Sequence, residues 1–297
     1  MANLKEVRDR IKSVKNTQQI TKAMKMVAAS KLRRAQQAIV QMRPYADKLN
    51  EMLVNILSNM EGDATTSFGK ERPVEKVCMV VVTSNKGLCG AFNNNVLKAA
   101  AAKIEESYSG VRKAGNLTIL PIGKKGNDYF RKRYGDCTII TDHVLLFNDL
   151  SFDNVAKVSQ SLMDSFEAGE YDVVDAAYGR FKNAAVQFPE CTQFLPVTKL
   201  EPEKGSGPKH KADYIFEPNK EDLLKHLVPS ILQTQFQKFL LDTHASEHGA
   251  RMTAMDAATE NAEELVKELK ISYNKARQEA ITKELSEIVG GAAALEG

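Results

Sequence analysis

The sequence predicts an α/β protein that combines a long antiparallel coiled coil of N- and C-terminal helices with a Rossmann-like α/β domain. Three observations support this prediction. Both ends of the 297-residue chain carry apolar residues at heptad spacing, the middle alternates β-rich and helical segments, and polar stretches separate these regions. We therefore expect an N-terminal shaft helix over residues 1–60, an α/β domain over 74–215 and a C-terminal shaft helix over 220–297.

The N-terminal helix is predicted by apolar residues that recur at alternating steps of three and four. The series begins with Leu4, Val7, Ile11 and Val14, and it resumes in the same phase with Leu32, Ala35, Ile39, Met42, Ala46, Leu49, Leu53, Ile56 and Met60. Heptads sustained over this length are typical of a coiled coil. Pro44 falls inside the series, and because the phase continues across it we expect a kink there rather than a helix end.

The C-terminal helix shows the same spacing. Its heptad positions are Leu241, Ala245, His248, Met252, Met255, Thr259, Ala262, Val266, Leu269, Tyr273, Ala276 and Ala280. Many of these residues are small, which lets two helices approach closely. Pro229 predicts that a short segment around Asp222–Val228 precedes the long helix.

Between the two helices, apolar strands alternate with helical segments. Strands are expected at Val77–Val82, Leu117–Ile122, Thr138–Ile140, Val173–Tyr178 and Gln193–Thr198, and helices at Asn95–Tyr108, Asn127–Tyr134 and Asn154–Ala168. This order is typical of a mostly parallel sheet. The first long helix ends where this domain begins and the second begins where it ends. We therefore expect the long helices to run antiparallel, as a two-helix shaft on a globular foot.

Charge is distributed unevenly along the chain. The net charge is +3, yet Arg10 to Ala46 contains nine basic residues and no acidic one, so this stretch is expected to meet an acidic partner. The apolar run Val77–Val82 is far shorter than the ~20 residues of a membrane span, and the N-terminus has no pattern of a secretory signal. Four cysteines without a CxxC pair indicate reduced thiols rather than a disulfide framework or a zinc site.

Two motifs could carry chemistry, and both have a structural interpretation. The segment Thr83–Asn93 (TSNKGLCGAFN) follows a strand and opens a helix, as phosphate-binding loops do, but it matches neither common phosphate-loop pattern. We therefore expect Gly87 and Gly90 to permit a tight turn. His244 and His248 have metal-ligand spacing but lack a third ligand, and His248 falls on the heptad seam. We expect no catalytic residue, no cofactor and no metal site.

The heptad pattern of the first helix has one defect. Its phase reaches the polar residues Gln18, Thr21 and Lys25, while apolar side chains move to Ile20, Ala23, Met24 and Val27, as the sequence shows. A local stutter in packing would explain this. We favour a second surface that contacts a partner, because the acid-free basic stretch is centred on the same turns.

Three segments together resemble the γ-subunit family of F-type ATP synthases. They are IKSVKNTQQITKAMKMVAASKLRRA (Ile11–Ala35), GLCGAFN (Gly87–Asn93) and YNKARQEAITKELSEIVGGAAAL (Tyr273–Leu295). The last contains Ile281-Thr282-Lys283-Glu284, Glu287 and Gly291-Ala292, which look like the C-terminal signature of that family. The resemblance covers essentially the whole chain, and the lack of an inserted cysteine pair and of a transit extension favours a bacterial form.

The resemblance implies a central rotor shaft that couples ion flow through a membrane c ring to ATP synthesis or hydrolysis. The implied partners are the alpha and beta subunits of the catalytic ring, the epsilon subunit and the c ring, at the cytoplasmic face of the inner membrane. The implied contacts with the catalytic ring are Met24, Lys25, Lys31, Arg33, Arg34, Arg277, Thr282 and Glu284. In the foot, the implied contacts with epsilon and the c ring are His210, Lys211 and Tyr214, within Gly205–Phe216.

Three other functions compete with this interpretation. A nucleotide-dependent enzyme would need the phosphate-binding motifs that the sequence lacks. A nucleic-acid-binding protein would use the basic helix, but the long apolar seam of that helix requires burial. A non-rotary coiled-coil adaptor has the same sequence pattern as a shaft, and only the resemblance separates the two.

Overall fold

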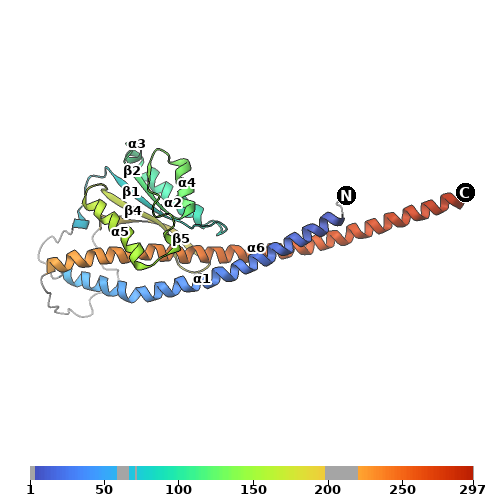
Figure 1. The fold of residues 1–297 in the computed structure, drawn as a ribbon, viewed down its shortest axis with the longest axis horizontal. Helices are drawn as coiled ribbons and strands as arrows, with labels where there is room; N and C mark the ends of the chain where they lie inside the picture. Colours follow the sequence, from blue (N-terminus) through green and yellow to red (C-terminus); the bar gives the residue numbers. More distant parts are fainter. Residues whose placement is uncertain (1–3, 59–66, 71, 198–219, 297) are drawn as a thin grey trace. The chain divides into compact units, whose positions relative to one another are not determined.

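The computed structural model describes residues 4–58, 67–70, 72–197 and 220–296, which form two compact units (Figure 1). The helical unit comprises residues 1–28 and 252–297, and the α/β unit comprises residues 29–251. Helix α1 (Leu4–Ser58) and helix α6 (Lys220–Glu296) each contribute residues to both units. The two long terminal helices of the prediction are thus confirmed.

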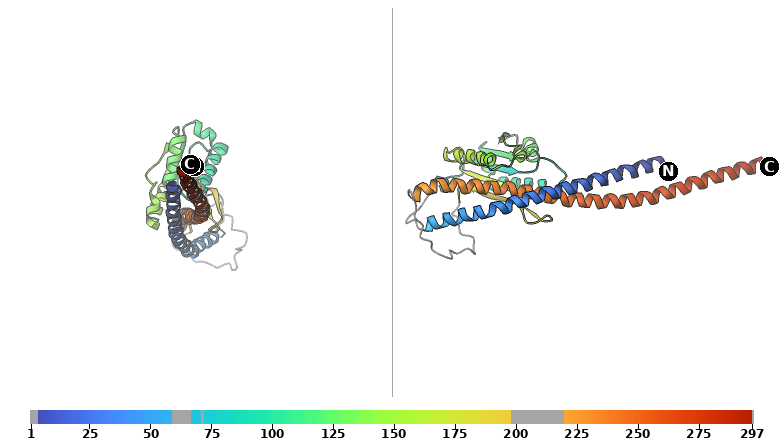
Figure 2. Two further views of the ribbon diagram at one scale, coloured as in Figure 1. Left: turned by 90° about the vertical axis from the view of Figure 1, so that its right-hand side faces the viewer. Right: turned by 60° about the horizontal axis from the view of Figure 1, so that its bottom comes forward.

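In the helical unit, α1 and α6 lie side by side and run antiparallel (Figure 2). The Arg8 guanidinium donates a hydrogen bond to the Tyr273 hydroxyl at 2.9 Å, and Lys25 forms an ion pair with Asp256. Lys25 lies 17 residues after Arg8, whereas Asp256 lies 17 residues before Tyr273. The two chains therefore advance in opposite directions, as predicted.

The seam between these helices follows the predicted heptad positions. On α1, Val7, Thr21 and Ala28 are buried, and on α6, Met255, Ala262 and Val266 are buried. The heptad phase is therefore kept through the polar positions of α1. By this register Leu4 lies near residue 277 of α6, and α6 continues beyond the start of α1 (Figure 1).

Both prolines lie inside continuous helices. Pro44 is within α1, and Pro229 is within α6, which already begins at Lys220. The expectation of a separate segment around Asp222–Val228 was therefore wrong. An interior proline costs a helix about 3 kcal/mol, but Leu227, Val228, Ile231 and Leu232 around it are buried, and each such side chain contributes ~1.5–3 kcal/mol.

The α/β unit contains a five-stranded sheet in the order β3-β2-β1-β4-β5. Strands β1 (Val77–Val82), β2 (Leu117–Ile122), β3 (Thr138–Ile139) and β4 (Val173–Phe181) are parallel, and β5 (Gln187–Leu195) pairs antiparallel with β4. The mostly parallel sheet is confirmed. The last strand begins six residues earlier than predicted, because an exposed edge strand that contains Pro189 gives little apolar signal.

Helices cover both faces of the sheet and create two cores. One face packs against α5 (Phe152–Glu167) and the buried side of α6, with Phe166, Phe194 and Phe236 among its fully buried side chains. The other face packs against α2 (Phe92–Ser107) and α4 (Lys124–Arg133), with Met79, Ile119 and Phe130 at its centre. The short helix α3 (Ser109–Lys113) and the 3-10 turns η1 (Ser67–Gly69) and η2 (Leu146–Asn148) were not predicted.

Helix α6 is fixed to the sheet by polar contacts as well as by apolar packing. At Gly179 of β4, the backbone N–H donates to the Thr243 hydroxyl at 3.2 Å, and the carbonyl accepts from the Ser246 hydroxyl at 3.0 Å. A side chain at Gly179 would collide with the Phe92 ring, 2.4 Å from the added carbon. This glycine therefore leaves room for the Phe92 ring of α2 against the strand, while the Cβ of Ser246 on α6 would lie 3.4 Å from the added carbon.

None of the helices in the described part of the chain has an apolar stretch long enough to cross a membrane.

Candidate functional site

The first candidate surface is an apolar stripe on α1 in the helical unit, formed by Ile20, Ala23, Met24 and Val27. Ile20 is 60% exposed and Val27 is 57% exposed, while Met24 is half-buried. Ile20, Met24 and Val27 are spaced i, i+4 and i+7, so they share one face of the helix. The seam with α6 uses Gln18, Thr21 and Lys25 instead. The predicted displacement of apolar side chains to a second surface is therefore confirmed.

The apolar stripe is unusual because nothing in the helical unit covers it, within the residues that the structure describes. Scattered exposed apolar residues are common on soluble proteins, but a contiguous stripe on a regular helix is typical of a protein–protein contact. Met26, although 62% exposed, lies about 120° around the helix from the stripe.

Lys25 does not belong to this stripe. Its ammonium group forms an ion pair with the Asp256 carboxylate across the seam. One turn away, the hydroxyls of Thr21 and Thr259 lie 2.8 Å apart. Lys25, predicted as a partner contact, thus forms an ion pair within the helical unit, and no pattern in the sequence indicated Asp256 as its partner.

A basic run on α1 lies in the α/β unit. Lys31, Arg33 and Arg34 are all exposed there, and none of them forms an ion pair in the part of the chain that the structure describes. Lys31 also faces α6, where its positive charge helps to lower the pKa of His244. The exposed guanidinium groups of Arg33 and Arg34 are suited to bidentate binding of carboxylates.

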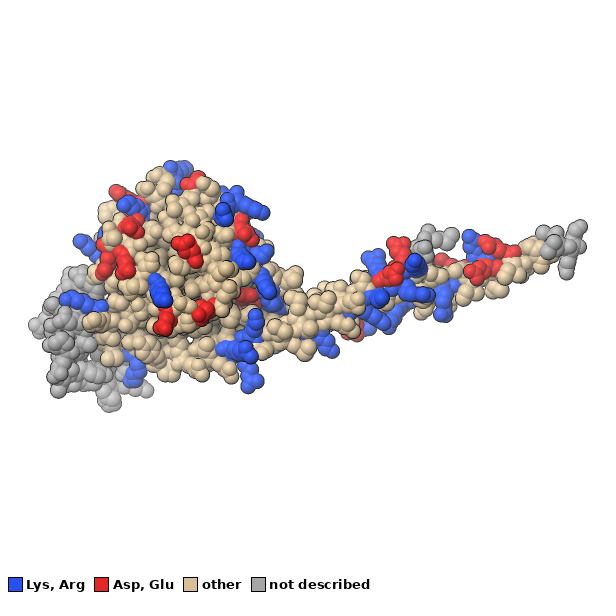
Figure 3. Space-filling view, viewed as in Figure 1, with Lys and Arg blue, Asp and Glu red and all other residues tan. Residues whose placement is uncertain are grey.

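The third candidate surface is the C-terminal part of α6. Arg277, Thr282 and Glu284 are exposed, as are the apolar residues Ile281, Leu285, Ile288 and Val289. Ile281, Leu285 and Ile288 share one helix face by their spacing. On the face shown in Figure 3, Lys/Arg and Asp/Glu side chains of the helical unit gather toward the chain ends.

The predicted foot contacts His210, Lys211 and Tyr214 lie outside the described residues, as does all of Gly205–Phe216.

The glycine loop after β1 forms a tight turn whose polar groups are already paired. Gly90 has φ 58° and Leu88 has φ 63°, both in the left-handed region. The helix that this loop opens is α2, and its first backbone N–H, that of Phe92, donates to the Cys89 carbonyl of the loop at 3.3 Å. The interpretation of this loop as a structural turn agrees with these contacts.

Arg251 of α6 holds the same loop from the other side. Its guanidinium donates to the carbonyl of Gly87 and, at 3.2 Å, to that of Lys86. It also pairs with Glu247 at 2.5 Å, and both side chains are about nine-tenths buried. This ion pair was not predicted, although its i, i+4 spacing is visible in the sequence.

His244 and His248 contact each other on one face of α6. Their Nε2 atoms lie 3.0 Å apart, so one ring donates to the other. Burial lowers the pKa of His244 to about 4 and that of His248 to about 3, which keeps both rings neutral near pH 7. Among the described residues, no group of three or more His, Cys, Asp or Glu could hold a metal ion.

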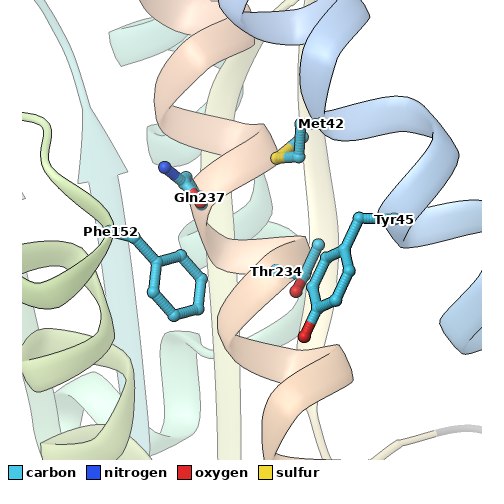
Figure 4. A pocket seen from close by; sticks show the side chains of 5 residues that line it. All are labelled: Met42, Tyr45, Phe152, Thr234 and Gln237. Atoms are coloured by element: carbon cyan, nitrogen blue, oxygen red, sulfur yellow. The ribbon is translucent and has the colours of Figure 1, made fainter.

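A hollow of about 340 Å³ opens between α1, the start of α5 and α6 in the α/β unit (Figure 4). Its five lining residues are Met42, Tyr45, Phe152, Thr234 and Gln237, and none of these carries a charge. The Thr234 hydroxyl donates to the Ser230 carbonyl at 2.8 Å. Such walls offer few polar groups to orient a small ligand.

Together, the antiparallel helical unit and the mostly parallel sheet define a coiled-coil protein that carries an α/β domain. Comparison with known proteins identifies the family within this class. Residues 3–295 match the family model described as "ATP synthase". The chain is 52% identical to the ATP synthase gamma chain of Flavobacterium psychrophilum, and the match covers 100% of each chain. It is 51% identical to that of Cytophaga hutchinsonii, over 99% of each chain. The chain belongs to the ATP synthase gamma chain family.

Solved structures support the fold. A chain of the Euglena gracilis mitochondrial ATP synthase (OSCP/F1/c-ring, rotational state 3) is similar with a TM-score of 0.64 and 22% identity, over 98% of this chain and 94% of that one. A chain of the Tetrahymena thermophila mitochondrial ATP synthase central stalk/c-ring is similar with a TM-score of 0.55 and 24% identity. That match covers 80% of this chain and 99% of the other.

Proposed function

We propose that the chain is the central rotor shaft of a bacterial ATP synthase. In this function it couples ion flow through the membrane c ring to ATP synthesis or hydrolysis in the ring of alpha and beta subunits. Its membership of the gamma chain family supports this proposal. The coupling works by differential contact: a shaft that turns must favour a different state of each catalytic subunit in turn, and hydrolysis must in return turn the shaft.

The uncovered stripe of Ile20, Met24 and Val27 is the observation that carries this proposal. At these turns of α1 the seam is occupied by Gln18, Thr21 and Lys25, so the apolar side chains of the stripe are available to a partner. Burying such a stripe against the catalytic ring would contribute ~25 cal/mol for each Å² removed from water. Ala23 and Met24 lie within it, and Met24 is the predicted contact that belongs to this surface.

The charged contacts follow from the exposed basic groups of α1. Lys31, Arg33 and Arg34 suit acidic loops of the catalytic subunits, since charge complementarity steers association and orientation. On α6, Arg277, Thr282 and Glu284 provide the opposing contacts, and the apolar residues near Ile288 fit a hydrophobic collar in which the tip turns.

The remaining partners are the epsilon subunit and the c ring, which we assign to the segment that contains His210, Lys211 and Tyr214. The chain then lies at the cytoplasmic face of the inner membrane as a peripheral subunit. It contributes no catalytic residue and no cofactor site, and the nucleotide chemistry belongs to its partners.

The proposal is tested by co-expressing the chain with the alpha and beta subunits of the same organism and then reconstituting the complete complex in membranes. We expect the chain to co-purify with the ring and to be required for steady ATP hydrolysis. Val27→Asp should lower ATP-driven ion pumping relative to hydrolysis by about tenfold, because a charge within an interface hot spot costs ~1–2 kcal/mol or more.

Met26→Asp is the matched control, because Met26 is an equally exposed apolar residue on another face of the same turn. Equal effects of the two variants, or no effect of either, would contradict the stripe as a contact.

An engineered disulfide between the shaft and the ring distinguishes a rotor from a fixed adaptor. If the chain is a rotor, ATP hydrolysis by the complex stops until the disulfide is reduced. If the chain is a fixed adaptor, hydrolysis continues with the disulfide in place.

A further inference from the structure

The seam of the helical unit contains a polar layer where a coiled coil would ordinarily be apolar. The layer consists of Thr21 and Lys25 on α1 and of Asp256 and Thr259 on α6. Thr21 is buried, whereas the Lys25 and Asp256 side chains are 40% and 46% exposed. Apolar or small residues lie on both sides of it, including Ala28 on α1 and Ala262 on α6.

The two threonine hydroxyls of the layer form a short hydrogen-bonded chain. Thr21 and Thr259 lie 2.8 Å apart, so one hydroxyl donates to the other. The accepting hydroxyl can still donate to the carbonyl of its own helix, which is Gln18 at 3.0 Å for Thr21 and Met255 at 2.7 Å for Thr259. Buried polar groups are costly when they lose their partners, so this network favours the one alignment in which both hydroxyls meet.

Other alignments of the two helices break the network. A slide of one heptad in either direction would set Thr21 opposite Val266 or Met252 and leave a buried hydroxyl without its partner on the other helix. The Lys25–Asp256 ion pair forms in the same alignment of the two helices. The Arg8–Tyr273 hydrogen bond, nearer the start of α1, also requires this register. A polar residue at a seam position is a known way to specify coiled-coil register.

From these contacts we infer that the polar layer fixes the register between α1 and α6, and we call it a register lock. Its positioning residues for rotary coupling are Thr21, Lys25, Asp256 and Thr259. The inference rests on the proposed rotor function. Torque between the ends of a shaft tends to slide its helices past each other. A slip of one residue moves a helix by about 1.5 Å along its axis and turns its side chains by about 100°. The apolar stripe beside the layer would then face the wrong part of a partner.

The lock acts through geometry more than through stability. An ion pair as exposed as Lys25–Asp256 contributes little to folding, and replacing a polar seam by apolar residues is often neutral or stabilising. A residue that served only for stability would therefore change the melting temperature, whereas a register residue changes coupling. Lys25 then affects coupling through Asp256 rather than by touching the catalytic ring.

A charge swap tests this in the complete complex in membrane vesicles, measured as the ratio of ATP-driven ion pumping to ATP hydrolysis. Lys25→Asp and Asp256→Lys are each expected to lower this ratio about fivefold, and the double variant Lys25→Asp/Asp256→Lys to restore it to within about twofold of the parent. Lys22→Asp is the matched control, because it makes the same charge change at an exposed position of the same turn, and it should leave the ratio unchanged.

The threonine pair provides a second test that does not depend on charge. Thr21→Val/Thr259→Val is expected to keep or raise the melting temperature of the chain and yet to lower the coupling ratio about twofold or more. The inference is wrong if the charge-swapped double variant couples no better than the worse single variant, or if Lys22→Asp has the same effect. It is also wrong if the valine pair leaves coupling intact. None of these results would alter the outcome for Val27→Asp, which tests the rotor function itself.

Discussion

Arg251 was not predicted from the sequence, yet it connects two parts of the α/β unit. Its guanidinium joins the buried carboxylate of Glu247 to the carbonyls of Lys86 and Gly87, and so connects α6 to the loop after β1. Burial raises the pKa of Glu247, while the positive charge and hydrogen bond of Arg251 oppose that rise. Removing the arginine would therefore leave a carboxylate buried without its main partner.

We expect Arg251→Met to lower the free energy of unfolding by about 3–5 kcal/mol, because it leaves a buried charge uncompensated. Arg251→Met/Glu247→Leu should recover more than half of that loss, since it removes both charges, although the loop carbonyls still lose their donor. Urea unfolding of the isolated chain, followed by circular dichroism, measures both values. A double variant as unstable as the single one would show that the loop contacts, and not the ion pair, dominate.

At the scale of single residues, the sequence predicted which side chains are exposed better than it predicted which side chains pair with each other. The displacement of Ile20 and Val27 from the seam could be read from heptad phase alone, because it depends only on local helical geometry. The engagement of Lys25 could not, because it depends on which residue of α6, more than 230 positions away, lies opposite. Register between distant helices is a tertiary property that a one-dimensional pattern leaves open.

At the scale of elements, α6 changes its environment along its length. Phe236, Leu240 and Ala245 are buried in the α/β unit, Val266 is buried only by the seam of the helical unit, and every residue from 281 to 292 is exposed. A helix that lacks tertiary packing is marginal in water, because most helical stability in proteins comes from burial of an apolar face. The end of α6 should therefore be the least stable part of the element.

Hydrogen exchange checks this gradient. In the isolated chain, the amides of 281–292 should exchange much faster than those of 236–245, and assembly with the alpha and beta subunits should slow them at least about tenfold, equivalent to ~1.4 kcal/mol. Amides of the buried strand β1 serve as the internal control and should change little. Equal exchange of 281–292 in the free and assembled chain would contradict a partner contact there.

The strands show where element prediction succeeds and where it fails. The central strands β1 and β2 were predicted at their observed bounds, because a strand buried on both faces is a near-continuous apolar run. The edge strand β5 was displaced, because most of its residues are partly or fully exposed and it contains Pro189. Pro229 misled the prediction for the opposite reason: tertiary burial outweighed a strong local signal.

At the scale of the whole molecule, buried polar groups are concentrated where α6 meets the sheet. Asp242, Thr243, Ser246, Glu247, His248 and Arg251 are all buried within ten residues of one helix. Such an interface specifies one seating of the helix, because each polar group needs its own partner. It also makes the stability of the α/β unit depend on pH, through groups whose pKa differs between the folded and unfolded chain.

The His244–His248 pair sets the sign of one such dependence. Burial lowers both pKa values from 6.5, to about 4 for His244 and about 3 for His248, and the charge of Lys31 lowers both further, while Arg251 acts on His248. Between pH 6.5 and 4 the unfolded chain therefore binds more protons than the folded chain. The stability that the neutral pair contributes is fully present above pH 6.5 and is lost as the pH falls toward 4.

We accordingly expect His244→Gln/His248→Gln to flatten the acid side of the stability profile. Each histidine accounts for about 2 kcal/mol of the loss between pH 7.5 and pH 5. Because the two rings are coupled, the double variant should lose ~2–4 kcal/mol less than the parent over that range. His226→Gln, at an exposed position of the same helix, is the control, and its stability profile should follow that of the parent.

Asp242 contributes to the pH dependence with the opposite sign, because burial raises its pKa to about 6. The histidine contribution is therefore measured as the difference in the free energy of unfolding between variant and parent at each pH. Parallel profiles for parent and double variant would mean that the rings become protonated as readily in the folded chain as in the unfolded one.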